Sequence, residues 1–489
     1  MEIKMNKKTK RSNADNLAKI DIVQDSGTKG MDRRDFLTKS AIAGAAVGIS
    51  GLGLTSISCS ENKNKPVAKS LATGFQPLEV NSPMAKWKNP QPLDFVSQAT
   101  KNYNFRNWQS GNDESIYYNL NLPSFFKSRV VMPPSKTSLL ERNINADLLN
   151  LTFNAHDKTT TPTLKEYLVG PRQVQAMMMA HKGKVVFECY PGMNPTDIHV
   201  WMSASKTTAS LLATMLWEDG KLDFDKTVPN YVPDLKGTAW DKITVKNAMN
   251  MASGLDMEET FENLINPDSW ISNFFTAVFD GKGDWQQLVQ KAQPIAGEQP
   301  GDRFRYSSAI TMVLVLIVQN ITQMPWQDLW KERVWSKIGA RNPFIIGLAP
   351  DGTPIAAGMI NTTPEDMLRY ALLYTPSWDV VAKEKVISDK LLKRIQTLGD
   401  HKAYHASTEE EYGTKWFGET PDLNTAQWDH AFKDGAMFKH GNMGQGIYVD
   451  PERDFCGCYF GLATNDEKVA GIDHSPGYLR SAAKHLAGK

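Results

Sequence analysis

The sequence has few cysteines and no excess of charge of either sign. Its 489 residues include four cysteines, and 55 lysine and arginine residues balance 54 aspartate and glutamate residues. So few cysteines exclude a disulfide framework, and a formal net charge of +1 gives no indication of a nucleic-acid partner. With 41% apolar residues, the chain has the composition of a sizeable globular protein.

Metal-ligand spacing is also lacking. Cys456 and Cys458 stand two residues apart in an apolar run, where a strand would point both side chains to one face. A disulfide at that spacing would be strained, and no histidine stands near enough to complete a metal site. Cys189 lies in another strand-like run. We therefore expect buried core thiols and no bound metal.

Residues 1–59 lack a hydrophobic run long enough for a membrane span and are typical of an export signal. The run Asp-Arg-Arg-Asp-Phe-Leu-Thr-Lys at 32–39 resembles a twin-arginine signal, and residues 41–57 are only mildly apolar. Met31 is an alternative start to Met1, and a basic arm before a helix is the alternative to a signal. The signal predicts export by the twin-arginine route to the periplasm.

Cys59 ends this segment and is a candidate for lipidation. It follows small residues, as in a lipoprotein cleavage site, although Ser56 stands where such sites usually have leucine. Residues 60–70 are polar and predict a flexible linker. A lipid on Cys59 would hold the exported protein at an envelope membrane, and we expect no other contact with a membrane.

The remaining chain divides into a wrapping region at 71–172 and a main domain at 173–489. The wrapping region is rich in proline, asparagine, tryptophan and tyrosine, so we expect irregular segments with one short helix near 145–151. A strand hairpin with a turn at 181–184 opens the main domain, and strand signals return from Lys415 onward.

A helical insertion at about 203–400 separates these strands. Apolar periodicity predicts helices at 203–219, 244–251, 271–279, 285–292, 308–321, 326–335, 363–373, 389–398 and 478–487, and strands at 174–180, 185–190, 436–440, 445–449 and 456–464. Strands at both ends of a helical block predict an α/β (α+β) fold, in which an antiparallel sheet is flanked by helices and carries an inserted all-helical domain.

Ser203 and Lys206 form a Ser-x-x-Lys motif at the start of a mostly small and apolar helix. Three residues apart on a helix, they share one face, so a lysine with a lowered pKa could take the proton of the serine hydroxyl. The alternative is a helix-capping serine beside a solvent-facing lysine. The same spacing occurs at Ser26/Lys29, Ser60/Lys63, Ser124/Lys127 and Ser481/Lys484.

Two further motifs follow in the chain. Tyr306 stands at the mouth of a predicted helix, where its phenol could act in ionised form or relay a proton. Lys439-His440-Gly441-Asn442 lies between two predicted strands, and Gly441 would let a substrate carbonyl approach the backbone. The alternatives are an amphipathic core tyrosine and a plain hairpin turn.

The order Ser-x-x-Lys, Tyr-x-x, Lys-x-Gly resembles the class C β-lactamase family of serine hydrolases, which includes D-stereospecific peptidases, esterases and 6-aminohexanoate-dimer hydrolases. The resemblance covers residues 173–489 and implies a β-lactamase/transpeptidase-like fold with no cofactor. It implies Ser203 as nucleophile, Lys206 and Tyr306 as the acid–base pair, and the Asn442 N–H as an oxyanion donor opposite that of Ser203. Burial and repulsion from Lys439 would lower the pKa of Lys206.

Two positions depart from the β-lactamase pattern. Ser308 replaces the asparagine of Tyr-x-Asn, and His440 replaces the threonine of Lys-Thr-Gly. Both changes favour small esters or amides as substrates, bound by Ser308, Lys439, His440, Gly441 and Asn442. If His440 instead holds the lysine place, the register moves by one and the oxyanion assignment of Asn442 no longer follows.

We therefore predict an exported serine hydrolase that cleaves a small-molecule carboxylic ester or amide through an acyl-serine intermediate. No Gly-x-Ser-x-Gly elbow supports a Ser-His-Asp site. One alternative is a penicillin-binding protein, D-amino-acid peptidase or β-lactamase. An alternative of another class is a non-catalytic envelope-binding lipoprotein that keeps the fold.

Overall fold

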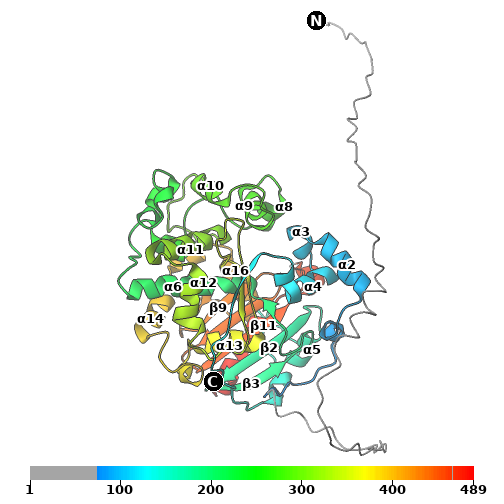
Figure 1. Ribbon diagram of the computed structural model, residues 1–489. Helices are drawn as coiled ribbons and strands as arrows, with labels where there is room; N and C mark the ends of the chain where they lie inside the picture. Colours follow the sequence, from blue (N-terminus) through cyan, green and yellow to red (C-terminus); the bar gives the residue numbers. More distant parts are fainter. Residues whose placement is uncertain (1–73, 465, 489) are drawn as a thin grey trace, which may run out of the picture. The chain divides into compact units, whose positions relative to one another are not determined.

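The computed structural model describes residues 74–464 and 466–488, which belong to the compact unit Ser70–Lys489 (Figure 1). The predicted export signal, the lipidation site at Cys59 and the linker at 60–70 lie outside the described residues. Their assignments stay predictions.

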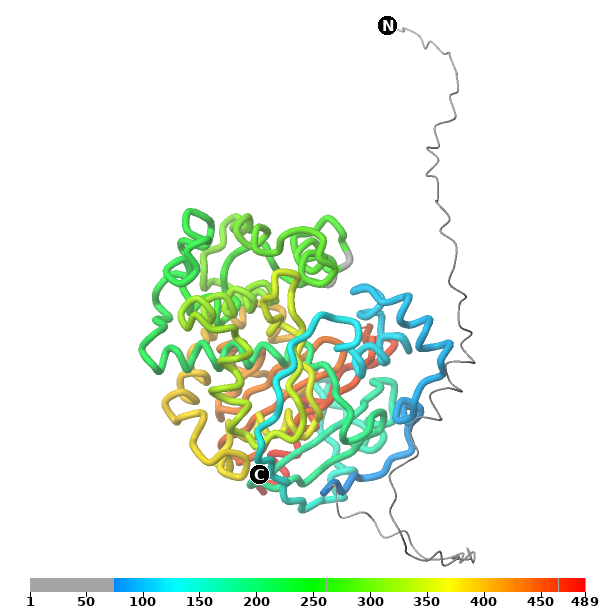
Figure 2. The backbone as a smooth tube through the Cα atoms, viewed as in Figure 1, coloured from blue at the N-terminus to red at the C-terminus, as the bar shows by residue number. Residues whose placement is uncertain are grey.

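A seven-stranded antiparallel sheet is built from both ends of the main domain, with strand order β3-β2-β11-β10-β9-β8-β7. Figure 2 shows the orange and red strands beside the teal hairpin, with the green helices inserted between them in the chain. The strands are β2 (Val174–His181), β3 (Lys184–Cys189), β7 (Leu423–Thr425), β8 (Trp428–Ala431), β9 (Met437–Gly441), β10 (Gln445–Asp450) and β11 (Phe455–Gly461). The predicted hairpin and the predicted antiparallel sheet are confirmed.

Each face of this sheet packs against helices. Phe438 and Tyr459 lie on the face covered by α18 (Ser475–Leu486). Cys456 and Cys458 lie on the opposite face, which packs against α13 (Pro364–Leu372). The two cysteines and Cys189 are buried free thiols, as predicted for these three positions.

The strand predicted at Lys415 is wrong, because α16 (Glu409–Phe417) runs through this residue. Three glutamates occupy the first turn of α16, where the helix dipole favours negative charge. Lys415 pairs with Glu411 one turn earlier, and Gly418 ends the helix in the left-handed conformation (φ 70°). These helix signals outweigh the aromatic residues that suggested a strand.

A second, four-stranded antiparallel sheet was not predicted. Its strands have only two to four residues, too few to show an alternating pattern. They are arranged in the order β1-β5-β6-β4, with bounds β1 (Ser128–Val131), β4 (His199–Val200), β5 (Phe344–Gly347) and β6 (Ile360–Thr362). Strand β4 leads directly into the segment that carries Ser203.

The wrapping region contains more helix than predicted. Three α-helices form between residues 93 and 121 alone, namely α2 (Leu93–Asn102), α3 (Phe105–Trp108) and α4 (Asp113–Asn121). Asn104 and Asn112 cap α3 and α4 through their side chains, so asparagines that suggested irregular chain instead begin helices. The helix predicted near 145–151 is the 3₁₀ turn η3 (Ala146–Asn150).

The inserted block is mostly helical, but it is not all-helical as predicted, because β5 and β6 lie within it. Figure 1 shows α8 to α11 gathered away from β2 and β3. The single helix predicted at 203–219 is instead a 3₁₀ turn, η4 (Met202–Ser205), followed by α6 (Lys206–Glu218). The other helices of the chain are α5 (Leu164–Leu168), α7 (Val245–Met249), α8 (Phe261–Ile265), α9 (Trp270–Phe279), α10 (Trp285–Gln290), α11 (Ser308–Thr322), α12 (Trp326–Trp330), η8 (Lys331–Trp335), α14 (Asp389–Thr397), α15 (His401–His405) and α17 (Glu467–Ala470).

Helix α11 lies in the core with most of its residues buried. In the part of the chain that the structure describes, no single helix has the length and apolar character of a membrane span. Only the bent pair of α11 with Trp326–Trp335 reaches that length and composition.

Candidate active site

Ser203 follows a short, tightly held segment. The Trp201 N–H donates to the Ile360 carbonyl of β6 (2.7 Å), and the Trp201 indole N–H donates to Thr362 Oγ1 (2.8 Å). Met202 then adopts a left-handed conformation with φ of 48°, which costs a non-glycine residue about 1–2 kcal/mol. The fixed strand end holds this strained residue and so determines where Ser203 lies in η4, just before α6.

Lys206 is fully buried and makes three polar contacts. Its Nζ donates to the Ala357 carbonyl (2.6 Å) and to Ser308 Oγ (2.8 Å), and it lies 3.1 Å from Ser203 Oγ. A neutral amine has two N–H donors and one lone pair, whereas an ammonium has three donors and no acceptor. With both donors used on Ala357 and Ser308, the lone pair of neutral Lys206 is left for the Ser203 hydroxyl.

The pKa of Lys206 is lowered to about 7, chiefly by burial. The Lys439 cation lowers it further, while the Glu259 and Asp429 carboxylates act in the opposite direction. Burial and Lys439 are the two causes that the sequence predicted. A lysine with this pKa is largely neutral above pH 7 and can accept a proton.

Tyr306 lies between two lysines, just before the start of α11. Lys439 Nζ donates to the phenol oxygen (3.1 Å), and the Nζ atoms of Lys439 and Lys206 stand 4.6 and 5.2 Å from the ring centroid. Burial, Asp429 and Glu259 raise the pKa of Tyr306 well above its usual value, although a hydrogen bond with Ser203 opposes them. The phenol is therefore neutral, which favours the proton relay over the ionised form.

The structure places Ser308 on Lys206. Its hydroxyl accepts from Lys206 Nζ, and its backbone N–H donates to the Glu259 carboxylate. Glu259 also donates its own backbone N–H to the Tyr306 carbonyl (2.9 Å). Ser308 thus contacts the lysine through one lone pair of its hydroxyl, and its role in substrate binding stays a prediction.

Lys439, and not His440, occupies the lysine place beside Tyr306. Neighbouring side chains on a strand point to opposite faces, so His440 on β9 lies on the other face of the sheet. There its ring packs against Trp416 with centroids 4.6 Å apart and the ring planes tilted by 32°, and its Nε2 stands 3.6 Å from Asp473 Oδ2. The predicted substrate contact of His440 has no support in this geometry.

Gly441 brings the end of β9 against the segment that carries the serine. A Cβ at this position would lie 2.5 Å from the Trp201 carbonyl oxygen and 3.1 Å from Met202 Cβ. Only glycine allows this approach, which places the turn at Asn442 near Ser203. The Asn442 N–H as second oxyanion donor stays a prediction.

Three residues that form hydrogen bonds to the active-site residues were not predicted from the sequence. Asp429 accepts two hydrogen bonds from Lys439 Nζ (2.8 Å each), and Glu259 supports Tyr306 and Ser308. Gln109, at the end of α3, accepts from Asn442 Nδ2 (2.5 Å). None belongs to a motif, because each meets its partner only through the fold.

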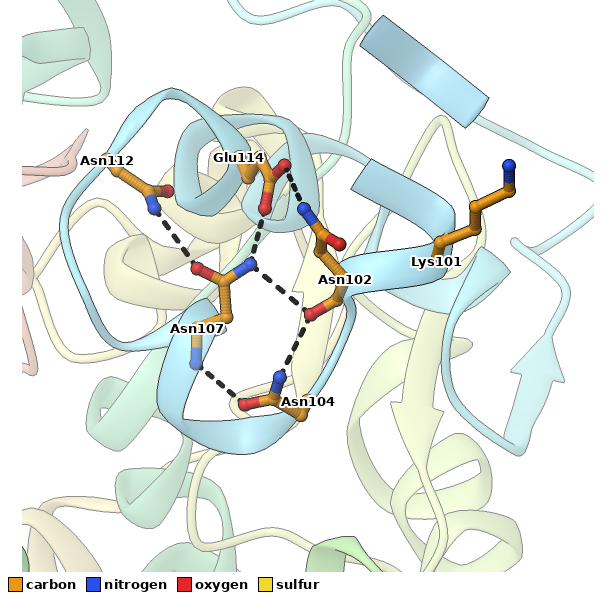
Figure 3. Close-up of a pocket in the computed structure, with 6 residues that line it drawn as sticks. All are labelled: Lys101, Asn102, Asn104, Asn107, Asn112 and Glu114. Carbon is orange, nitrogen blue, oxygen red and sulfur yellow. Dashed lines mark hydrogen bonds between the residues drawn. The ribbon is translucent and has the colours of Figure 1, made fainter. Parts of the chain in front are cut away.

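A polar pocket in the N-terminal helices contains none of these active-site residues. Figure 3 shows its amide side chains bonded to one another and to Glu114. Asn107 Oδ1 accepts from Asn112 Nδ2 (3.1 Å), and Asn102 Nδ2 donates to Glu114 (2.9 Å). Over residues 74–464 and 466–488, His, Cys, Asp and Glu side chains form no cluster of three or more that could hold a metal ion.

Comparison with known proteins identifies the family. The family model described as Beta-lactamase matches residues 172–480, well over half of the chain. A 6-aminohexanoate-dimer hydrolase from Paenarthrobacter ureafaciens is 24% identical over 289 residues, which cover 57% of this chain and 70% of that protein. A beta-lactamase from Providencia stuartii is 46% identical over 143 residues, which cover 29% of this chain and only 33% of that protein.

Solved structures show the same fold. A Bacillus anthracis protein assigned as a 6-aminohexanoate-dimer hydrolase matches with a TM-score of 0.63 at 21% identity, covering 77% of this chain and 96% of its own. A hydrolase described as having promiscuous acyltransferase activity matches with a TM-score of 0.50 at 17% identity, covering 65% and 96%. The predicted β-lactamase/transpeptidase-like fold class is confirmed. The chain belongs to the beta-lactamase family of serine hydrolases.

Proposed function

We propose that this protein hydrolyses a small carboxylic ester or amide through an acyl-serine intermediate on Ser203. One observation carries the proposal: the buried Lys206 amine stands 3.1 Å from Ser203 Oγ, and its pKa is lowered to about 7. A serine hydroxyl needs a base within hydrogen-bond reach, and Lys206 supplies one without a metal or an organic cofactor.

The acylation step uses groups that already contact one another. Ser203 Oγ attacks the carbonyl carbon while its proton passes to Lys206 Nζ. The carbonyl oxygen becomes negative and receives hydrogen bonds from the backbone N–H groups of Ser203 and Asn442. Tyr306 then gives a proton to the leaving oxygen or nitrogen, and the proton taken up by Lys206 replaces it.

Deacylation repeats these roles with water as the nucleophile. Water loses a proton to Lys206 as its oxygen attacks the acyl carbon, and Ser203 leaves with a proton returned to its oxygen. Lys439 is paired with Asp429 and donates to Tyr306. Its charge favours the phenolate that forms briefly when Tyr306 gives up its proton.

We infer an ester or small amide as the substrate, because Ser308 is shorter than the asparagine of a β-lactamase and His440 packs on Trp416 on the other face of the sheet. Similarity to a 6-aminohexanoate-dimer hydrolase supports this branch of the family. Export by the twin-arginine route to the periplasm, with a lipid on Cys59 as the only membrane contact, remains part of the same proposal.

Fluorophosphonate labelling of the full chain, read by peptide mass spectrometry, tests the proposal. We expect one label, on Ser203, and none in the Ser203→Ala variant. A label on another serine would contradict the assigned nucleophile. A chain that folds, binds cell-envelope material and takes no label would instead support the non-catalytic alternative.

A further inference from the structure

We infer that Asp429 is a positioning residue of this site, which holds the Lys439 ammonium on the Tyr306 phenol and closes the open edge of β9 beside Gly441. The inference rests on the proposed function and adds a residue that no motif of the sequence indicated.

One buried carboxylate accepts three hydrogen bonds here. Lys439 Nζ donates to both oxygens of Asp429 (2.8 Å each), and the His440 backbone N–H donates to Oδ2 (2.9 Å). The side chains of Lys439 and Asp429 are 0% and 4% exposed. A cation without access to water is stable only beside an anion of good geometry, and Asp429 supplies both the charge and the geometry.

The position of Asp429 follows from the strand register. Strand β8 pairs with β9 at His430–Phe438 and Ala431–Met437, and the pairing ends there. The next residues, Asp429 and Lys439, face each other where the two strands separate. The Asp429 carboxylate replaces the missing strand partner by accepting the His440 N–H, so that this buried donor is not left unsatisfied.

Lys439 in turn has little freedom. Its remaining contacts are the Tyr306 phenol oxygen and the His440 carbonyl, both at 3.1 Å. Without Asp429, the ammonium would keep two neutral acceptors and no counter-ion. We therefore expect its loss to displace Lys439 from Tyr306 and to weaken proton delivery to the leaving group.

Other charges surround the pair but do not replace Asp429. Burial, together with the charges of Asp429 and Glu258, raises the pKa of Glu409 on α16 to about 8. His430 on β8 is buried, and its pKa is lowered to about 3, chiefly by burial. Asp429 is therefore the carboxylate in direct contact with Lys439.

A double-mutant cycle tests whether Asp429 acts through Lys439. Steady-state hydrolysis of p-nitrophenyl butyrate is measured for the wild type, Asp429→Asn, Lys439→Met and the double variant. Asparagine keeps the shape but removes the charge, so we expect kcat to fall about 10²-fold while KM changes less than threefold. In the Lys439→Met background the same substitution should cost much less, because its partner is already gone.

The matched control is Asp450→Asn at the opposite end of β10. Asp450 is also fully buried and accepts from Arg453 Nη1 (2.9 Å) and Tyr448 Oη (3.0 Å). We expect this variant to have a lower Tm than the wild type, with kcat within threefold. This control distinguishes the general effect of losing a buried ion pair, Asp450–Arg453, from the effect of losing the Asp429–Lys439 pair at the active site.

Two results would overturn the inference: a kcat of Asp429→Asn within threefold of the wild type, or losses that simply multiply in the double variant. If Asp429→Asn does not accumulate, Asp429→Glu decides. Its longer side chain should lower kcat at least tenfold, and an unchanged kcat counts against the inference. An inactive wild type without a label on Ser203 refutes the proposed function instead, so the two failures are distinguishable.

Discussion

Lys206 is a residue whose burial has opposite consequences for folding and for catalysis. An exposed lysine keeps its proton to about pH 10.4, whereas burial beside Lys439 lowers the pKa of Lys206 to about 7. Below about pH 10 the folded state is therefore less stable than it would be if the pKa of this lysine were unshifted, and the loss of stability is complete below about pH 7. The same cost provides a neutral amine next to Ser203 at physiological pH.

Replacing Ser203 removes the attacking oxygen. We expect Ser203→Ala to lower kcat by at least about 10⁴-fold, because loss of a covalent nucleophile typically costs several orders of magnitude. The Tm should stay close to that of the wild type, since no core contact is lost. Burst kinetics with a p-nitrophenyl ester, together with circular dichroism, provide the measurement. A variant retaining a tenth of the wild-type kcat would refute the assignment.

Replacing Lys206 changes the pH dependence. Only neutral Lys206 can take the serine proton, so kcat/KM should rise with pH along a limb centred near 7, the pKa of the buried amine. Lys206→Arg keeps a positive charge that cannot be given up. Its kcat/KM should fall at least about 10²-fold and lose this limb in a profile from pH 5 to 9. An arginine variant with the wild-type profile would exclude Lys206 as the base.

At the scale of single elements, β9 and η4 must approach closely for the site to form. Gly441 permits this approach, because an added Cβ would lie 2.5 Å from the Trp201 carbonyl oxygen. The opposite side of the β9–β10 turn is held by Gln109 through Asn442. The N-terminal helices thus support the turn that is expected to carry an oxyanion donor.

Gly441→Ala tests this approach. The methyl group must push β9 away from η4, so the Asn442 and Ser203 N–H groups should separate. We expect kcat for the p-nitrophenyl ester to fall about 10²–10³-fold, as for loss of one oxyanion donor. Gly457→Ala on β11 is the control, since its Cβ would meet Leu479 Cδ2 at 2.6 Å, away from the site. It should lower Tm but keep kcat, whereas an active Gly441→Ala enzyme would argue against the predicted oxyanion hole.

The sequence predicted some elements much better than others. Helix α11 and the β2–β3 hairpin have long apolar patterns, and their predicted positions agree with the structure. The strands of the small sheet are too short to show a period, and α16 has aromatic residues that suggested a strand. The local sequence pattern determines α11 and the β2–β3 hairpin, whereas tertiary packing determines the short strands and α16.

At the scale of the whole molecule, the site draws on segments far apart in the chain, and Asn442 and Gln109, which share a hydrogen bond, are 333 residues apart. Four motif residues, Ser203, Lys206, Tyr306 and Lys439, were visible in the sequence because each stands in a recognisable pattern. Asp429, Glu259 and Gln109 were not visible, since an acidic or amide residue gains a partner only when the strands and helices are assembled. The motifs therefore identified the chemistry but not its supports.

The positions of Ser308 and His440 in the structure predict which class of substrate reacts faster. Ser308 contacts Lys206 and is shorter than the asparagine of the β-lactamase pattern, and His440 lies against Trp416, so we expect neither to hold the side-chain amide or the carboxylate of a β-lactam. A substrate without its hydrogen-bond partners is discriminated against strongly. We therefore expect kcat/KM for p-nitrophenyl butyrate to exceed that for nitrocefin. If nitrocefin were preferred tenfold, about 1.4 kcal/mol in transition-state binding, the protein would be a lactamase.

The sheet joins β2, which ends at His181, to β11, which begins at Phe455. Ribosomes add about 5–20 residues per second, so on the order of tens of seconds pass between the synthesis of these two neighbours. During this interval the apolar edge of β2 has no partner and can pair with other chains. Newly made protein is therefore expected to depend on chaperones until its last quarter is complete, and chains that end before β9 should aggregate without ever gaining activity.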